Sequence, residues 1–311
     1  MGEVAPLRFD ELSADCAPGE VQAMRVAAGA DKGLGMPAPL WRTSRNSGTV
    51  LLLCLAALFL LEGPTGRIVV CCVAAALLGL WVWLVAWWSR QARRLALGRA
   101  RLARFAAANG FTYDPRRLPF PPDLDPELLY RGVGSDATIR DRLTGIRGRA
   151  FDTYALNFTT TAGLRPTGRN RVTHVRGVLH FELPAELPGL WLDSETRPVL
   201  GGYWNALDRY PKTLELEGDF QSQFRLRHAA DANPAELLYV LQPDLMAVLH
   251  DFGRGIQLQI AGRSVYLIGR FALPSGGRRI TENLFALFDA LAPKLEKLAL
   301  QRRTTSDEAP R

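Results

Sequence analysis

The sequence predicts the α+β class: an N-terminal transmembrane helical hairpin followed by a cytosolic domain of antiparallel strands and amphipathic helices. Three observations lead to this prediction. The stretch from Val50 to Trp88 holds only two charged residues, Glu62 and Arg67. Later segments either alternate apolar and polar residues, as half-buried strands do, or repeat apolar residues every three or four positions, as amphipathic helices do. Strand and helix signals do not alternate regularly, which favours antiparallel pairing over a doubly wound sheet.

Residues 1–47 are expected to form a disordered cytosolic leader. They mix glycine, proline and alanine with alternating charges, and they show one short helix signal, around Pro18 to Ala28. The leader also lacks the apolar core of a secretory signal peptide. We therefore expect an anchored chain and not an exported one.

Residues 48–89 are predicted to form the transmembrane hairpin. Its second helix, Ile68 to Trp88, has twenty-one residues without a charge, which at about 1.5 Å per residue matches the roughly 30 Å hydrocarbon core. The first run, Thr49 to Leu61, has only thirteen residues. A full span and a re-entrant or interfacial segment both remain open for it. A turn containing glycine and proline, Glu62 to Arg67, joins the two.

An arginine-rich juxtamembrane stalk helix is expected over residues 90–110, ending at Asn109-Gly110. By the positive-inside rule its arginines place both termini in the cytoplasm, as in a multi-pass protein of the plasma membrane. The lipid bilayer is then a partner, and these arginines, here called the collar, either contact anionic lipid or only fix the topology. The collar residues are Arg90, Arg93, Arg94, Arg99, Arg101 and Arg104.

The formal net charge of +7 is concentrated in the collar, because residues 90–104 hold six arginines and no acid. A nucleic-acid footprint spreads basic residues over a folded face, so no nucleic-acid partner is expected. Three of the four cysteines lie in the apolar stretch, the fourth lies in the leader, and the four histidines are scattered. This pattern predicts no disulfide scaffold and no metal site, and no cofactor is expected because no cofactor-binding motif is present.

Residues 111–300 are predicted to be the cytosolic α+β domain. The best strand candidates are Arg149 to Phe158 and Val172 to Leu183, joined as a hairpin by a thirteen-residue polar loop. In the second strand, Leu179 and Phe181 share one face, while His174 and His180 lie on the other. We expect the face with the histidines to be solvated.

The second half of this domain adds further elements. Leu183-Pro184 and Leu187-Pro188-Gly189 are expected to close the second strand, so that Leu190 to Leu192 begins another. Asn233-Pro234 predicts a helix start, with asparagine as the N-cap, and Gln242-Pro243 breaks and restarts that helix. The remaining predictions are a strand at Phe220–Leu226, a hairpin of Ile256–Ile260 with Val265–Ile268, an amphipathic helix from Thr281 to Leu300 that bends near Pro293, and a polar tail at 301–311.

Three segments carry a resemblance to known proteins, namely Phe220-Gln-Ser-Gln-Phe224 with the helix that follows, the step Leu241-Gln-Pro243-Asp-Leu-Met246, and the strand Gly148-Arg-Ala-Phe-Asp-Thr-Tyr154. With these segments the chain resembles a family of bacterial membrane-anchored proteins of unknown function, and its actinobacterial members in particular. The resemblance covers roughly residues 95–300. It implies two N-terminal transmembrane helices and a cytosolic α+β domain, and it assigns no catalytic residue.

The sequence shows no catalytic motif. The residues that come nearest to a catalytic set are Asp152, His174 and His180. The two histidines are six residues apart on one strand, about 20 Å, which is too far to share a metal or a proton. We therefore expect a non-enzymatic membrane-anchored module that binds an unknown protein partner, with Arg165, Arg169 and Arg171 as the expected contact residues. The alternative is a membrane-tethered enzyme or ligand-binding sensor whose site is not visible as a motif.

Overall fold

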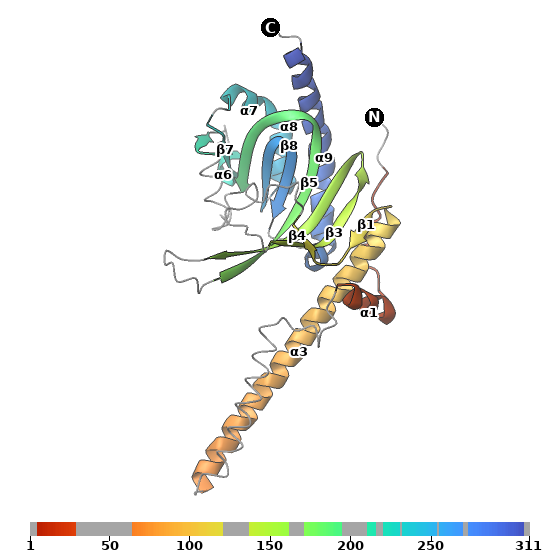
Figure 1. The fold of residues 1–311 in the computed structure, drawn as a ribbon, viewed down its shortest axis with the longest axis vertical. Helices are drawn as coiled ribbons and strands as arrows, with labels where there is room; N and C mark the ends of the chain where they lie inside the picture. The colour runs from red at the N-terminus through yellow and green to blue at the C-terminus, as the bar shows by residue number, and fades with distance from the viewer. Residues whose placement is uncertain are drawn as a thin grey trace. The chain divides into compact units, whose positions relative to one another are not determined.

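The protein is represented by a computed structural model, which describes residues 5–28, 64–120, 137–161, 171–194, 210–215, 220–230, 232–253, 255–269 and 273–307. The chain divides into two compact units. One comprises residues 1–15 and 98–311, and the other comprises residues 16–97. The larger unit therefore begins at residue 98, inside the predicted stalk, and includes the first part of the predicted leader (Figure 1).

The unit of residues 16–97 contains α1 (Pro18–Ala27) and most of α3 (Pro64–Ala108). Helix α1 confirms the short helix expected in the leader. Pro18 occupies its first turn, where a missing N–H costs nothing, and the Glu20 carboxylate accepts a 2.9 Å hydrogen bond from the Ala17 N–H. Helix α3 ends at Ala108, before Gly110 with a φ of 70°, which confirms the expected glycine stop.

The predicted transmembrane hairpin is contradicted. No helix within the described ranges is both long enough and apolar enough to cross a membrane. The apolar residues from Ile68 onward belong to one helix that continues without a break into the arginine-rich segment. Four residues of this apolar part are tryptophans, whose side chains combine an apolar ring with a polar N–H. The lack of a membrane-spanning helix within the described ranges contradicts the prediction of a multi-pass protein of the plasma membrane, from which the cytoplasmic placement of both termini was inferred. The first apolar run, residues 49–61, lies outside the described residues.

The larger unit is built on one eight-stranded sheet, and each of its described strand pairs is antiparallel. This confirms the α+β class. The path through the sheet is β1-β3-β4-β5-β7-β6, while β2 pairs with β3 and β8 pairs with β5. The strands are β1 (Thr112–Asp114), β2 (Leu118–Pro119), β3 (Thr138–Arg147), β4 (Arg149–Thr161), β5 (Arg171–Ser194), β6 (Lys212–Leu214), β7 (Phe224–His228) and β8 (Ile256–Gly269).

Strand β5 is continuous where the sequence predicts a break, and in Figure 1 it forms an arch alongside β8. Proline has no N–H to donate to a neighbouring strand, so it fits where regular pairing is interrupted. Pro184 and Pro188 lie in such a stretch of β5, because the pairing of β5 with β4 ends at His180 and its pairing with β7 begins at Leu190. The register between β5 and β8 is also shifted there. Strand β8 is likewise one strand and not a hairpin. Gly262, with a φ of 61°, bends it opposite Leu187, so both strands turn together.

The helices of the larger unit are η1 (Phe9–Leu12, a 3₁₀ turn), α6 (Phe220–Gln223), α7 (Pro234–Val240), α8 (Pro243–Phe252) and α9 (Leu273–Asp307). The Asn233 side chain accepts a 3.0 Å hydrogen bond from the Ala235 N–H, which confirms the predicted N-cap. Helix α9 runs through Pro293, and its non-helical residue is Gly277. The predicted strand at Phe220 begins four residues later, after α6.

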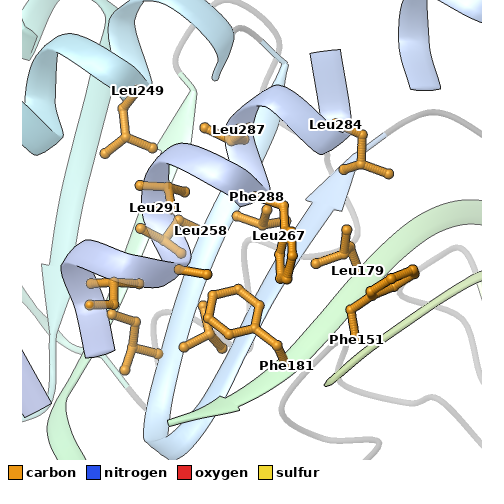
Figure 2. Close-up of a cluster of buried hydrophobic side chains, with 14 of the residues drawn as sticks. Phe151, Leu179, Phe181, Leu249, Leu258, Leu267, Leu284, Leu287, Phe288 and Leu291 are labelled. Atoms are coloured by element: carbon orange, nitrogen blue, oxygen red, sulfur yellow. The ribbon is translucent and has the colours of Figure 1, made fainter. Parts of the chain in front are cut away.

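The main hydrophobic core lies between one face of the sheet and α9. Figure 2 shows Phe151, Leu179 and Phe181 of the sheet near Phe288 of the helix, and the Phe288 ring contacts the rings of Phe151 and Phe181. Three residues from the end of α3 belong to the same core, namely Leu102, Phe105 and Ala106. The end of the predicted stalk is thus buried in the domain.

The opposite face of the sheet is not simply solvated, which corrects the expectation for the histidine face. A second apolar cluster covers part of it, because Val178 shares that face with His174 and His180 and cross-strand neighbours bring in aromatic rings. Partly buried Leu118 and Phe120 pack against this cluster. Its buried members are Ala137, Ile139, Tyr154, Leu156, Phe158, Val178, Tyr266 and Ile268.

Candidate functional site

The strand register brings together two of the three residues that the sequence singles out. Asp152 of β4 lies opposite His180 of β5, and His180 lies opposite Tyr266 of β8 on its other side. Tyr154 is two residues along β4 from Asp152 and so projects from the same face. His174 lies six residues from His180 at the other end of this row, opposite Phe158.

The Asp152 carboxylate is held by an arginine from the neighbouring strand. Arg142 donates from its Nε to both carboxylate oxygens at 3.1 Å and from a terminal nitrogen to Oδ2 at 2.8 Å. The hydrogen bond to Asp152 raises the pKa of Arg142 above its ordinary value, outweighing the opposing effect of burial. Asp152 therefore forms a partly buried ion pair with Arg142. Within the part of the chain that the structure describes, no hydrogen bond joins Asp152 to His180.

His180 is a neutral, stacked imidazole. Its ring lies 4.7 Å from the ring of Tyr266, centroid to centroid, at an interplanar angle of 23°. Burial lowers the pKa of His180, although the charges of Asp152 and Glu182 act in the opposite direction. Its buried Nε2 atom has no hydrogen-bond partner. The imidazole is thus placed to accept or donate one hydrogen bond, but it is not oriented by a carboxylate as a catalytic base is.

Tyr154 has the second unpartnered polar atom on this face. The side chain is 1% exposed, and its hydroxyl makes no hydrogen bond. Burial, followed by the nearby charge of Asp152 and by Tyr266, raises the pKa of Tyr154 well above its usual value, so it remains a phenol. Tyr154 and His180 therefore both leave hydrogen-bonding capacity unused next to the Arg142–Asp152 pair, which is uncommon for buried groups.

His174 belongs to a different part of the sheet, where β4 and β5 run beyond their neighbours. Pairing of β3 with β4 ends at Asn157, and pairing of β8 with β5 ends at Gly177. The segments 158–161 and 171–176, here called the basic ribbon, pair only with each other in the described sheet and project as a narrow two-stranded arm (Figure 1). The His174 and Phe158 rings stack at 5.1 Å, and burial, followed by the charge of Arg176, lowers the pKa of His174.

The predicted partner contacts lie on this ribbon or on its connecting loop. Arg171 is the first residue of β5 and pairs with Thr161, while Arg165 and Arg169 lie outside the described residues. From Thr153 to Phe181 the chain contains no aspartate or glutamate, whereas it contains arginine at 165, 169, 171 and 176. The ribbon is therefore a projection of one charge sign.

The collar arginines divide into two groups. Arg90, Arg93 and Arg94 are exposed. Arg101 donates to the Ala14 carbonyl at 3.1 Å, and Arg104 donates to the Asp15 carbonyl at 2.8 Å. Half of the collar thus has a role within the folded unit, because Arg99 is also buried there.

Arg99 forms a buried ion pair that sequence reasoning missed. It donates to the two carboxylate oxygens of Asp141 at 2.7 and 3.1 Å, and the Tyr113 hydroxyl donates to the same carboxylate at 2.8 Å. Burial alone would lower the pKa of Arg99, but the hydrogen bonds and charge of Asp141 outweigh it and raise the pKa. Burial and the Asp141 charge raise the pKa of Tyr113. In the sequence, the alternation of charges at Arg140, Asp141 and Arg142 is the signal that could have indicated a buried ion pair here.

No group of three or more potential metal ligands occurs within the ranges that the structure describes. Chemically, the sheet face offers hydrogen bonds from a phenol and a neutral imidazole, and the ribbon offers positive charge.

Comparison with known proteins gives a weak likeness to a solved structure. No family model and no curated protein matches the chain, so the family resemblance described above stays a prediction. Among solved structures, the chain is similar to the mycobacterial trehalose monomycolate transport factor A, TtfA, at 13% identity and a TM-score of 0.39. The match covers 65% of this chain and 93% of that chain. A likeness this weak supports no conclusion about fold or function.

Proposed function

We propose that the unit of residues 1–15 and 98–311 is a protein-interaction module that binds an acidic partner through the basic ribbon. The observation that carries this proposal is the ribbon itself. Its strands extend past β3 and β8, and residues 158–176, which comprise the ribbon and its connecting loop, hold four arginines and no carboxylate in the sequence. A projecting patch of one charge sign attracts a complementary surface and accelerates encounter with it.

Binding is favoured over catalysis by the state of the polar groups on the sheet. The Asp152 carboxylate is paired with Arg142, and the ring of His180 stacks on Tyr266. General acid–base catalysis needs a group whose proton is directed toward a substrate by an orienting partner. Neither group has such an arrangement, so this row supports a structural or recognition role.

A second candidate function is binding of a small polar ligand, favoured by the two unpartnered atoms, Tyr154 Oη and His180 Nε2. A ligand group that both donates and accepts, such as a hydroxyl, would satisfy them. This candidate predicts that Tyr154→Phe changes ligand binding without affecting capture of a protein partner.

The test is crosslinking in cells followed by identification of the captured proteins. Arg165, Arg169 and Arg171 are changed together to glutamate, and the matched control changes Arg90, Arg93 and Arg94 to glutamate. We expect the first variant to lose its partners and the control to keep them. Loss in both variants, or in neither, would contradict the proposal.

A second variant separates binding from catalysis. Replacement of Asp152, His174 and His180 by alanine is expected to leave the melting temperature within a few degrees and the captured partners unchanged. If this variant keeps its partners and its fold but loses the cellular phenotype of the wild-type protein, the enzyme or sensor alternative is favoured instead.

A further inference from the structure

Two arginines near the start of β3 differ from the other arginines of this part of the sheet. The described residues from 112 to 161 include six arginines, and four of them form salt bridges, whereas Arg117 and Arg140 form none with any described residue. The four bridges join Arg116 to Asp114, Arg142 to Asp152, Arg147 to Asp289 and Arg149 to Glu296. Arg117 and Arg140 are therefore exceptions where arginines are otherwise paired.

The strand register places these two arginines opposite each other. Leu118 of β2 pairs with Ile139 of β3, so the next pair in the same register is Arg117 with Arg140. The Arg117 Nε donates a 3.1 Å hydrogen bond to the hydroxyl of Thr138, which lies two residues before Arg140 and so on the same face of β3. Both arginine side chains thus lie on one face of the sheet, and like charges directly opposite each other destabilise a sheet.

A third arginine adds to the positive charge at this position. Arg140 is half-buried, and burial, followed by the charges of Arg117 and Arg99, lowers its pKa. The charge of Asp141 acts in the opposite direction. The Asp141 carboxylate, however, already accepts two hydrogen bonds from Arg99 and one from the Tyr113 hydroxyl. Since this carboxylate balances Arg99, the charges of Arg117 and Arg140 remain as an excess of two positive charges.

An anion with two negative charges matches this excess. A phosphate group carries a charge of about −1.5 to −2 at pH 7 and three strong acceptor oxygens. The planar fork of a guanidinium matches two such oxygens at once. Arg117 is exposed and uses its Nε on Thr138, so its terminal nitrogens make no hydrogen bond to the described residues. A carboxylate, with a single charge, would leave one of the two arginines unbalanced.

We propose that Arg117 and Arg140 form a binding site for a phosphate group, either inorganic phosphate or a phosphate monoester, where β2 meets β3. Thr138 holds Arg117 in place, and Arg99 adds positive charge without contacting the ligand. The phosphate belongs to a soluble molecule or to a lipid headgroup such as that of phosphatidic acid, and both present the same chemistry. The site contains no residue of the basic ribbon, so the inference does not rest on the function proposed above.

The first test measures binding of inorganic phosphate to the full-length protein by isothermal titration calorimetry near neutral pH. Arg117→Gln and Arg140→Gln remove the proposed contacts, and Arg116→Gln is the matched control because Arg116 already pairs with Asp114. We expect each of the first two variants to bind phosphate roughly tenfold to a hundredfold more weakly than the wild type, since each loses hydrogen bonds to a charged group. Equal weakening in Arg116→Gln, or no weakening in the other two, would overturn the proposal.

The melting temperature gives a second readout on the same proteins. Without phosphate, Arg140→Gln is expected to melt at or above the temperature of the wild type, because it removes one of two opposed like charges. With phosphate added at constant ionic strength, the wild type and Arg116→Gln should be stabilised and Arg140→Gln should not. Equal stabilisation of all three proteins would show that phosphate acts elsewhere and would overturn the site.

Flotation with phosphatidylcholine vesicles, with and without phosphatidic acid, distinguishes the two sources of phosphate. Binding that requires phosphatidic acid and is lost in Arg117→Gln and Arg140→Gln, without binding of inorganic phosphate, would assign the site to a lipid headgroup. Binding of inorganic phosphate with the same dependence on these variants assigns it to a soluble ligand. A wild type that binds neither probe would overturn the proposal.

The chain between β2 and β3 supplies a competing anion. Residues 121–136 lie outside the described residues, and their sequence includes Asp123, Asp125 and Glu127. The control replaces these three together by Asn, Asn and Gln. If this variant binds phosphate and the wild type does not, the chain's own carboxylates balance the two arginines, and the proposal is wrong.

Discussion

Asp141 shows how one residue can tie a helix to a sheet. Its φ of 54° is uncommon for a residue other than glycine, and it falls where the β3–β4 register shifts between Arg140 and Leu143. The backbone twist turns its carboxylate toward Arg99 of α3, which is 7% exposed. The bulge therefore serves to aim a side chain, as bulges often do.

We predict that Arg99→Leu destabilises the protein by about 3–5 kcal/mol, because it leaves the Asp141 carboxylate buried without its cation. The measurement is urea unfolding of the full chain. Arg94→Leu, on an exposed position of the same helix, is the control and is expected to change stability by less than about 0.5 kcal/mol. Equal effects of the two substitutions would show that the buried ion pair is not important for stability.

The neutral state of His180 makes stability depend on pH. Because its pKa is lowered in the folded state, the unfolded chain binds the proton more readily. Stability is therefore complete above the ordinary histidine pKa of about 6.5 and declines as the pH falls below it. We predict that His180→Phe, which keeps an aromatic ring against Tyr266, flattens the decline in melting temperature between pH 8 and pH 5.5. An unchanged slope would assign the decline to other groups, such as His174.

Among the elements, α3 contributes to the domain in a way that its sequence does not reveal. Its last turns carry Leu102 and Phe105, which are 1% and 0% exposed in the main core. Phe9 of η1 stacks on Phe105 at 5.5 Å. The segment is a core helix of the larger unit, not a stalk outside it.

We predict that a fragment of residues 98–311 melts cooperatively and that a fragment of residues 111–311 does not. Each large apolar side chain lost from the core removes about 2–5 kcal/mol, which is a large share of the stability of a typical domain. Differential scanning calorimetry of the two fragments is the measurement. A cooperative melt of the shorter fragment at the same temperature would mean that the end of α3 is dispensable.

Elements with local signals were predictable from the sequence, and those that depend on distant neighbours were not. The N-cap at Asn233 and the break at Gln242-Pro243 follow from a few adjacent residues. Strand β3 was missed, because its charged residues obscure the alternation and its apolar partners come from other strands. The turn expected near Gly262 is a bend that only the paired β5 explains. The prediction for residues 48–89 was wrong because a long run of residues with few charges was taken to indicate a membrane span.

The same limit applies to the candidate site. The basic ribbon could be expected because its charge and its hairpin are contiguous in sequence. The Arg142–Asp152 pair could not, because it depends on the register that follows the bulge at Asp141. The sequence therefore reveals the ribbon but not the state of the polar groups beside it.

At the scale of the whole unit, one core joins the sheet and α9. Leu287 is fully buried within it. We predict that Leu287→Asp abolishes the cooperative melt, since an unpaired buried carboxylate costs several kcal/mol. Leu238→Asp, at a position in α7 that is 51% exposed, should melt within a few degrees of the wild type. Thermal denaturation followed by circular dichroism distinguishes the two, and a cooperative melt of Leu287→Asp would place the core elsewhere.

The pairing of β5 with β8 also bears on how the protein is made. These strands are separated by more than sixty residues, and α9, which covers them, is C-terminal to both. Contacts this far apart in sequence form slowly. During synthesis, β5 must therefore wait with one edge unpaired and its apolar face uncovered until residues 256–307 have left the ribosome. A chain truncated before this point exposes a long strand with an unpaired edge and an uncovered apolar face. Premature termination late in translation should therefore yield aggregates and not a smaller functional protein.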